Sequence, residues 1–318
     1  MVKAIVLPLD GSPLAEHALP YATAIARALK ARLILLYARW PVIPEEDGPD
    51  LQVLADQLRT EGILVETHVF HLPSLGETGQ TIFEAADDLE AGLLVMATHG
   101  RGGLGRMLFG SVTDQVLRQA TLPVLLVSPS SGRPWPSDRP LRVLVTLDGS
   151  EQSEAVLEPL RDLVGPLGAE LVLLRVANSN DYVRPHGDQC DVCRSARSRG
   201  EEPDIEPVRV RRYVEKVADR LRVDGLRVEA EMHIGHPASI IARVAQARDV
   251  DLIAMATHGR GGLKRVVLGS VATDTLKRAS VPLLLVRPSM EMPRPDDDAP
   301  GGHVTHRGSP LSCGPPDS

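Results

Sequence analysis

The sequence predicts an α/β protein of two tandem domains, each built on a mainly parallel five-stranded sheet with helices on both faces. Three observations lead to this prediction. The 318 residues suffice for about two domains of ordinary size. Residues 96–104 recur unchanged as residues 255–263, at an offset of 159. Within each copy, short apolar runs alternate with stretches of helical periodicity, an order typical of parallel sheets covered by helices.

A second repeated block near the start of each copy sets the domain boundaries. It contains Asp10 and Asp148, which lie 138 residues apart. The offset therefore grows by 21 residues, and we place this net insertion in residues 178–207, a Gly-, Pro- and Arg-rich stretch interpreted as a mobile loop. The predicted organisation is a first domain 1–128, a linker 129–140, a second domain 141–288 and a disordered tail 289–318.

Five apolar runs predict the strands of the first copy: Ala4 to Leu9, Leu33 to Tyr37, Leu64 to Val69, Leu93 to Ala97 and Val124 to Val127. Between the first two, apolar residues recur at helical spacing from Ala15 to Leu29, which predicts one helix. The second copy repeats the order from Val143 to Val286. Such Rossmann-like sheets bind ligands at the carboxyl ends of strands where the strand order reverses, and both repeated blocks fall at that edge.

Composition argues against several classes of function. The net charge is −7 and aromatic residues make up 3% of the chain, which disfavours binding to duplex or single-stranded nucleic acid. No apolar run approaches the length of a membrane span, so we expect no membrane association. The start of the chain lacks the pattern of a signal peptide, and three Cys are too few for a disulfide framework. We therefore expect a cytoplasmic protein.

The longer block contains a glycine-rich loop suited to phosphate. Gly100 is followed after nine residues by Gly110 and Ser111, and Gly259 likewise by Gly269 and Ser270. Glycines let backbone N–H groups approach an anion, and the serines lie where the next helix begins, as N-caps or as hydroxyl donors. The alternative is a turn that only joins strand to helix. The loop is not a Walker A motif, because no Gly-Lys-Ser/Thr sequence closes it.

Charged and polar residues accompany the loop. Among its cations we favour Arg101 and Arg260 as phosphate contacts, while Arg106, Lys264 and Arg265 fit a solvated rim. Lys264 stands where the first copy has Gly105, which predicts a more electropositive second site. The roles of His99 and His258 stay open.

Asp10 and Asp148 end the first strand of each copy. Each carboxylate could bind a ribose or base, or hold Mg²⁺ against phosphates. The alternative is an Asp-Gly turn into a helix capped by Ser12 or Ser150, with Pro13 at the first helical position. Their predicted place opposite the glycine loop favours the binding role.

In these blocks the chain resembles the universal stress protein family. ATP-binding members of that family carry Gly-x2-Gly-x9-Gly-Ser/Thr after the fourth strand and an Asp at the end of the first. Here Ala97 and Ala256 replace the first glycine of the motif in both copies. The resemblance covers about residues 2–128 and 141–288, so it indicates a tandem form of the family.

The resemblance implies one adenine-nucleotide site per copy, with ATP as ligand and Mg²⁺ as an optional companion. The implied contacts of the first site are Pro8, Leu9, Asp10, Ala38, Met96, Ala97, Gly100, Arg101, Gly110, Ser111 and Val112. Those of the second are Thr146, Leu147, Asp148, Val176, Met255, Ala256, Gly259, Arg260, Gly269, Ser270 and Val271. It also implies that residues 124–127 pair with residues 283–286, so that the copies form a pseudo-dimer within one chain. A protein partner and a further homodimer stay open.

Two other motifs lead to weaker hypotheses. His233-Ile234-Gly235-His236 spells the signature of class I synthetases, but it follows the third strand of its copy instead of the first, and no Lys-rich signature loop accompanies it. Cys190-x2-Cys193 lacks a second ligand pair, so free thiols fit it better than structural zinc.

The function expected from the sequence is therefore an ATP-binding regulatory stress-response protein with two nucleotide sites. A slow ATP hydrolase is one alternative, although no general base or water-positioning residue is evident beside the loop. A partner-binding module with degenerate sites, blocked by Ala97 and Ala256, is the other.

Overall fold

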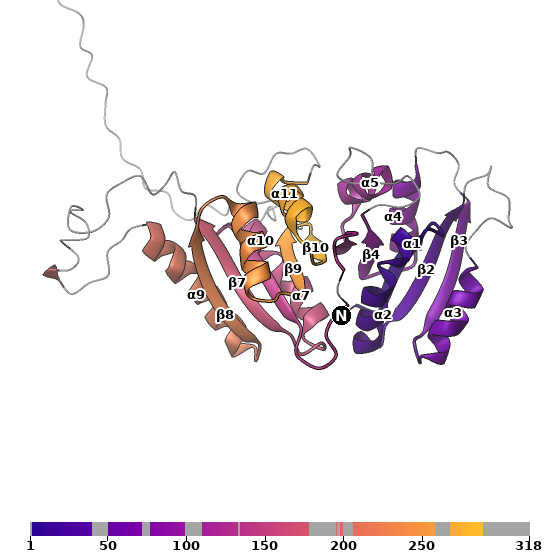
Figure 1. Ribbon diagram of the computed structural model, residues 1–318, viewed down its shortest axis with the longest axis horizontal. Helices are drawn as coiled ribbons and strands as arrows, with labels where there is room; N and C mark the ends of the chain where they lie inside the picture. The colour runs from indigo at the N-terminus through magenta and orange to yellow at the C-terminus, as the bar shows by residue number, and fades with distance from the viewer. Residues whose placement is uncertain are drawn as a thin grey trace, which may run out of the picture. The chain divides into compact units, whose positions relative to one another are not determined.

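The apolar runs of both copies become strands of one ten-stranded sheet in the computed structural model of the chain (Figure 1). It describes residues 2–39, 50–71, 77–98, 110–132, 134–177, 195, 198–199, 206–257 and 268–288. The chain divides into two units, Met1–Pro288 and Ser289–Ser318. The second unit lies outside the described residues, and the described helices and strands all belong to the first.

The first repeat alternates strands and helices as its sequence predicts. Its elements in chain order are β1 (Ala4–Leu9), α1 (Pro13–Glu16), α2 (Leu19–Leu29), β2 (Arg32–Arg39), α3 (Leu51–Thr60), β3 (Val65–His71), α4 (Thr78–Asp88), β4 (Leu93–Ala97), α5 (Ser111–Gln119) and β5 (Val124–Val127).

The second repeat follows the same order. Its elements are β6 (Arg142–Leu147), α6 (Glu151–Glu154), α7 (Leu157–Val164), β7 (Glu170–Ala177), α9 (Glu206–Val223), β8 (Arg227–Ile234), α10 (Pro237–Ala247), β9 (Leu252–Ala256), α11 (Ser270–Arg278) and β10 (Leu283–Val286). Among the described residues, no helix is both long enough and apolar enough to cross a membrane.

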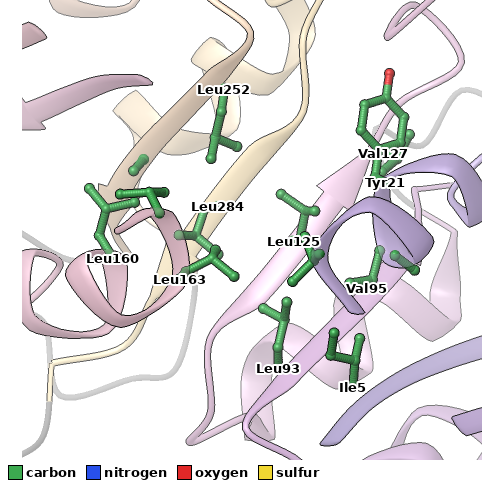
Figure 2. Packing of buried hydrophobic residues seen from close by; sticks show 14 of the residues in the cluster. Ile5, Tyr21, Leu93, Val95, Leu125, Val127, Leu160, Leu163, Leu252 and Leu284 are labelled. Atoms are coloured by element: carbon green, nitrogen blue, oxygen red, sulfur yellow. The ribbon is translucent and has the colours of Figure 1, made fainter. Parts of the chain in front are cut away.

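The strand order is β3-β2-β1-β4-β5-β10-β9-β6-β7-β8, and it reads alike from both ends when each strand of one repeat is matched to its counterpart. The strands within each repeat are parallel. At the centre β5 and β10 pair antiparallel, with Leu125 opposite Leu284, which confirms the predicted pairing of the two last strands. Figure 2 shows these two leucines among buried residues contributed by both repeats.

Two apolar clusters lie on the two faces of the sheet, so the prediction of helices on both faces is confirmed. The first-face cluster takes alternate strand residues such as Ile5 and Leu33 and is covered by α2, α3, α7 and α9. The second-face cluster takes the intervening residues, such as Val6 and Ile34, and is covered by α4, α5, α10 and α11. Both faces of the inner strands are largely buried, as their apolar runs indicate, whereas the edge strands β3 and β8 are partly exposed.

The predicted helix from Ala15 to Leu29 is wrong in one respect, because it is broken into α1 and α2 at His17 and Ala18. Pro20 explains the break: it has no N–H to donate and its ring would collide with the carbonyl four residues earlier in a continuous helix. The second repeat breaks at the matching place, between α6 and α7, with Pro159 in the first turn of α7.

The predicted loop 178–207 also ends too late, because α9 already begins at Glu206. Proline is tolerated in the first turn of a helix, so Pro207 does not stop α9 there. Val210, Val214, Val217 and Leu221 are buried along α9, which explains why this segment forms a helix. Most of the predicted loop, including Cys190 and Cys193, lies outside the described residues.

The segment between the repeats packs against both of them. The Tyr21 hydroxyl donates to the Ser131 carbonyl at 2.9 Å, and the Tyr21 ring meets Trp135 edge-on with centroids 5.6 Å apart. The Ser130 hydroxyl donates to the Ala279 carbonyl at 3.1 Å, at the end of α11. The Trp135 indole N–H donates to the Asp251 carbonyl at 3.2 Å, just before β9.

Candidate functional site

Each repeat has a topological switch point at the carboxyl ends of two neighbouring strands. In the first repeat the chain runs outward from β1 through β2 to β3, and then returns to β4 on the other side of β1. The second repeat does the same around β6, with β7 and β8 on one side and β9 on the other. Because the crossovers leave on opposite faces there, such a point is where open α/β sheets bind ligands.

The ladder between β1 and β4 stops before the two strands reach this edge. Between β1 and β4 only Ile5 pairs with Leu93 and Val6 with Leu94. The Ala4 carbonyl accepts from Gly92 N–H at 2.9 Å, so even-numbered residues of β1 direct their main-chain groups toward β4. Pro8 is one of these residues and has no N–H to donate. The missing donor therefore ends the ladder, and we call the ends of β1 and β4 beyond it, which the ladder does not join, the crevice of the repeat.

In the second repeat the corresponding ladder continues for one more residue pair. Thr146 stands where the first repeat has Pro8, and it does carry an N–H. The ladder between β6 and β9 accordingly extends to Val145 opposite Ala254. The two crevices thus share their place in the fold, but the ladder behind the second is one residue pair longer, because Thr146 has the N–H that Pro8 lacks.

Most residues predicted for the base side lie on one face of the sheet. Met96 and Ala38 belong to the second-face cluster or pack against it, and so do Met255 and Val176. Pro8 and Thr146 pair with Leu36 and Leu174, which belong to the same cluster, and paired strand residues share a face. The structure thus brings these six residues to the second face, at the mouths of the two crevices.

Leu9 and Leu147 do not join them through their side chains. Both are buried in the first-face cluster, 4% and 3% exposed. Only their main-chain groups can face a ligand in the crevice. Ala97 and Ala256 end β4 and β9 and are partly buried.

Helices α5 and α11 begin on the same face. The helix N-cap is Gly110 in α5 and Gly269 in α11, and neither helix start has a side-chain capping bond. Of the two roles predicted for Ser111 and Ser270, that of N-cap is therefore wrong, and that of hydroxyl donor stays a prediction: both are the first helical residue, and both are exposed. Since first-turn N–H groups have no acceptor within the helix, a glycine cap leaves them to an anion.

The glycine caps are fixed to the strands that precede them. Gly110 N–H donates to the Thr98 carbonyl at 2.9 Å, and Gly269 N–H donates to the Thr257 carbonyl at 3.1 Å. A Cβ at position 269 would lie 3.1 Å from that carbonyl oxygen, so glycine permits the close approach. Val112 and Val271 follow in the first turns of the two helices.

Sequence reasoning missed Thr113, which fixes the start of α5 in the first repeat alone. Its hydroxyl lies 3.3 Å from the Ala97 carbonyl and 3.3 Å from the Thr98 carbonyl, and it is buried. The second repeat has Ala272 at the matching position. No sequence signal could have identified Thr113, because the residue is not repeated.

The aspartates form the Asp-Gly turn that was the alternative to the favoured binding role. Asp10 Oδ1 accepts from the N–H and hydroxyl of Ser12, at 2.9 and 2.6 Å, and Ser12 Oγ accepts from Ala15 N–H at 3.1 Å. Gly11 has φ of +76°, in the left-handed region that favours glycine. Pro13 is the first helical residue, as predicted.

Asp148 and Ser150 repeat the arrangement, with Ser150 N–H 2.9 Å from Asp148 Oδ1. The turn-and-cap geometry is therefore present in both repeats, and it holds each carboxylate at the end of the strand that borders the crevice.

A close helix contact positions α5 beside α4. Gly79 N–H donates to Gln115 Oε1 at 2.9 Å, and a Cβ on Gly79 would lie 2.3 Å from the Gln115 Cβ and 2.8 Å from the Val112 carbonyl oxygen. The second repeat has Ala238 at the matching position, where α10 packs on α11.

We expect Gly79→Ala to lower the free energy of unfolding by about 1–2 kcal/mol, because overpacking between α4 and α5 outweighs the gain in helix propensity. Urea unfolding measures the change. The matched variant Ala238→Gly relieves no overlap and should cost about 1 kcal/mol through propensity. If Gly79→Ala stabilised the chain, the tight contact would be contradicted.

The electrostatics of α11 differ from those of α5. The pKa of the Asp274 carboxyl is lowered, first by a hydrogen bond from Lys277 and then by the charge of Lys277, with smaller contributions from Arg278 and His236. His236 at the start of α10 thus lies within electrostatic range of α11. The first repeat has the neutral Gln115 in place of Asp274.

Several predicted residues lie outside the described part of the chain: Gly100, Arg101, Gly259, Arg260, His99, His258, Arg106, Lys264 and Arg265. Within the described residues, no three His, Cys, Asp or Glu side chains gather closely enough to hold a metal ion.

Comparison with known proteins matches this arrangement to one family. The family model described as "Universal stress protein family" matches residues 1–128 and 141–287. A universal stress protein of Mycobacterium tuberculosis is 28% identical over 265 residues, which cover 79% of this chain and 80% of that protein. One of Thermus aquaticus is 34% identical over 137 residues, 40% of this chain and 99% of that protein.

A solved structure supports the fold. The crystal structure of a universal stress protein from Archaeoglobus fulgidus superposes with a TM-score of 0.62 at 19% identity, over 90% of this chain and 98% of that one. With two matches of the family model that together span most of its length, the chain belongs to the universal stress protein family.

Proposed function

We propose that the chain is an ATP-binding regulatory protein of the stress response, located in the cytoplasm, with one nucleotide site in each repeat. The repeats are residues 1–128 and 141–288, joined by the linker 129–140. One observation carries the proposal. In both repeats, a glycine-capped helix start, an opened strand pair and small aliphatic side chains meet on one face of the sheet at its switch point.

The phosphates would bind at the starts of α5 and α11. There the N–H groups of Ser111 and Val112, and of Ser270 and Val271, lie in first turns without a capping side chain. An anion at such a helix start gains from both the unsatisfied donors and the helix dipole. Gly100 and Arg101, and Gly259 and Arg260, would complete the two phosphate sites.

The base would lie against non-aromatic side chains on the second face, apolar except for Thr146: Pro8, Ala38 and Met96 in the first repeat, and Thr146, Val176 and Met255 in the second. Asp10 and Asp148 would bind the ribose hydroxyls or a Mg²⁺ that ATP brings with it. Glycine main chain and aliphatic side chains need few aromatic rings, consistent with the 3% aromatic content.

Mass spectrometry of ligand released from the purified chain tests the proposal, together with calorimetric titration of the stripped chain with ATP. We expect adenine nucleotide, with a stoichiometry of two per chain. No released nucleotide and no ATP binding at millimolar concentration would refute it and favour a module with degenerate sites. Phosphate release lost in Asp10→Ala plus Asp148→Ala would instead favour a hydrolase.

A further inference from the structure

The two proposed sites differ at one position on the strand beyond the base side. In the first repeat Ala38 of β2 pairs with Phe70 of β3. In the second repeat Val176 of β7 pairs with His233 of β8. Side chains of paired strand residues lie on the same face, about 4.8 Å apart. Phe70 and His233 therefore hold the same place in the two sites, next to the residue that borders the base.

Phe70 makes this place apolar in the first repeat. It packs against the second-face cluster together with Ala38. Its ring stacks near His68 with centroids 6.4 Å apart. A ligand at the first site would meet an aromatic ring here.

His233 makes the corresponding place polar in the second repeat, and a hydrogen bond orients its ring. Its Nε2–H donates to Glu231 Oε2 at 2.9 Å, and the Glu231 side chain is only 13% exposed. Arg248 at the end of α10 forms an ion pair with the other oxygen of Glu231. Because Nε2 is engaged, Nδ1 is the ring nitrogen left for a hydrogen bond to a ligand, as an acceptor in the neutral ring and as a donor in the protonated one.

The turn after His233 brings a second histidine to the same edge of the sheet. Gly235 has φ of +145°, a conformation that side chains disfavour, and its N–H donates to the Ala177 carbonyl at 3.0 Å. This tight turn leads directly to His236 at the N-cap of α10. The first repeat has Glu77 at the N-cap of α4. The second site is thus bordered by two histidines where the first has an aromatic ring and a carboxylate.

We infer that His233 is a ligand-contacting residue of the second site, where it hydrogen-bonds the polar edge of a bound nucleoside and makes the two sites unequal. The inference rests on the proposed function, because it assumes that nucleotides bind in both crevices. It also gives a role to the first histidine of the His-Ile-Gly-His motif. That role is ligand contact and requires no adenylyl transfer.

Titration with ATP in single-site chains tests the inference. Ser111→Glu, which places a carboxylate at the phosphate end of α5, leaves the second site for measurement. In that chain we expect His233→Phe to raise the dissociation constant for ATP about tenfold, and His233→Gln, which keeps a hydrogen-bonding group, to recover much of the loss. Ile234→Phe, next to His233 in β8 but on the opposite face of the strand, is the matched control and should change nothing.

The reciprocal chain carries Ser270→Glu and reports on the first site. There Phe70→His should bring the ratio of the dissociation constants for ATP and 2′-deoxy-ATP closer to the ratio found at the second site. Titration with 2′-deoxy-ATP separates the two polar edges: a loss on His233→Phe that is equal for both nucleotides assigns the contact to the base, and a loss for ATP alone assigns it to the ribose.

An unchanged affinity in both His233→Phe and His233→Gln, with thermal melting showing a folded chain, would overturn the inference while leaving two-site binding intact. If the Ser111→Glu and Ser270→Glu parents and the unsubstituted chain all failed to bind ATP, the proposed function itself would fail. The two failures are therefore distinguishable.

Discussion

Ser111→Glu is expected to remove nucleotide binding from the first repeat while the chain stays as stable as before. Ser111 is the exposed first residue of α5, and this helix start has no side-chain capping bond, so the substitution removes no cap. A carboxylate at a helix start interacts favourably with the dipole, by about 0.3–1 kcal/mol. The same negative charge repels the phosphates that the proposed site would hold.

Ser270→Glu should do the same to the second repeat, since Ser270 starts α11 in the same way. Calorimetric titration with ATP should give about two sites in the unsubstituted chain, one in either variant and none in the double variant. Ser111→Ala and Ser270→Ala are the matched controls, and each should change stability by less than about 0.5 kcal/mol. Two sites persisting in the double variant would exclude α5 and α11 as the phosphate sites.

The strands and their alternation with helices along the chain could be predicted because the signal is local and occurs in both repeats. Four- to six-residue apolar runs are typical of strands buried on both faces, and β1, β4 and β5 begin and end where those runs do. Alternation with helices then fixes a parallel sheet, and the two repeated blocks point to its switch point. The repetition adds evidence that a single copy lacks, because both copies of each block fall at the carboxyl ends of the strands.

The details that were wrong depend on geometry that only the folded chain defines. Serine is a common N-cap, but at Ser111 the cap is Gly110, because its N–H bonds to the end of β4 and turns the chain one residue earlier. Leu9 adjoins Pro8 in sequence, yet strand alternation sends its side chain to the opposite face. That Pro8 ends the ladder between β1 and β4 could be seen only once the structure showed that the main-chain groups of this residue face β4 and not β2.

The contacts of the linker could not be predicted from the sequence, for a different reason. Its proline and serine content predicts a connection between domains, and nothing in it indicates a partner. The structure places Asp251 at the start of β9, where the first repeat has Gly92, and this single difference provides a buried carboxylate for Arg139. Because only one copy has it, comparison of the repeats offers no hint of its role.

Asp251→Ala is expected to lower the free energy of unfolding by about 3 kcal/mol or more. The Asp251 side chain is 1% exposed and accepts two bonds from the Arg139 guanidinium, at 2.7 and 2.8 Å, and one from Arg142 N–H at 2.9 Å. Alanine would leave a largely buried guanidinium and a main-chain donor without this acceptor. Removing one partner of a buried ion pair costs about 3–5 kcal/mol, and we expect the lower end of this range because Arg139 keeps its bond to the Asp249 carboxylate.

Asp249 provides the matched control, since Arg139 also donates to its carboxylate at 3.2 Å but that side chain is 55% exposed. Exposed ion pairs contribute little, so Asp249→Asn should cost less than about 1 kcal/mol; asparagine also tolerates the positive φ of this residue. Urea unfolding of the three chains, unsubstituted, Asp251→Ala and Asp249→Asn, measures both effects. A loss below about 1 kcal/mol for Asp251→Ala would show that the buried pair contributes no more than the exposed one.

The double variant Asp251→Ala with Arg139→Met separates the ion pair from the packing of the linker. With the guanidinium gone, no buried charge is left unpaired, so the double variant should be more stable than Asp251→Ala alone. The indole bond of Trp135 goes to the main-chain carbonyl of Asp251 and survives both substitutions. If the double variant is instead as unstable as Asp251→Ala, the loss comes from the Arg142 N–H and the cavity, and the linker is held by Trp135, Tyr21 and Ser130 without help from its arginine.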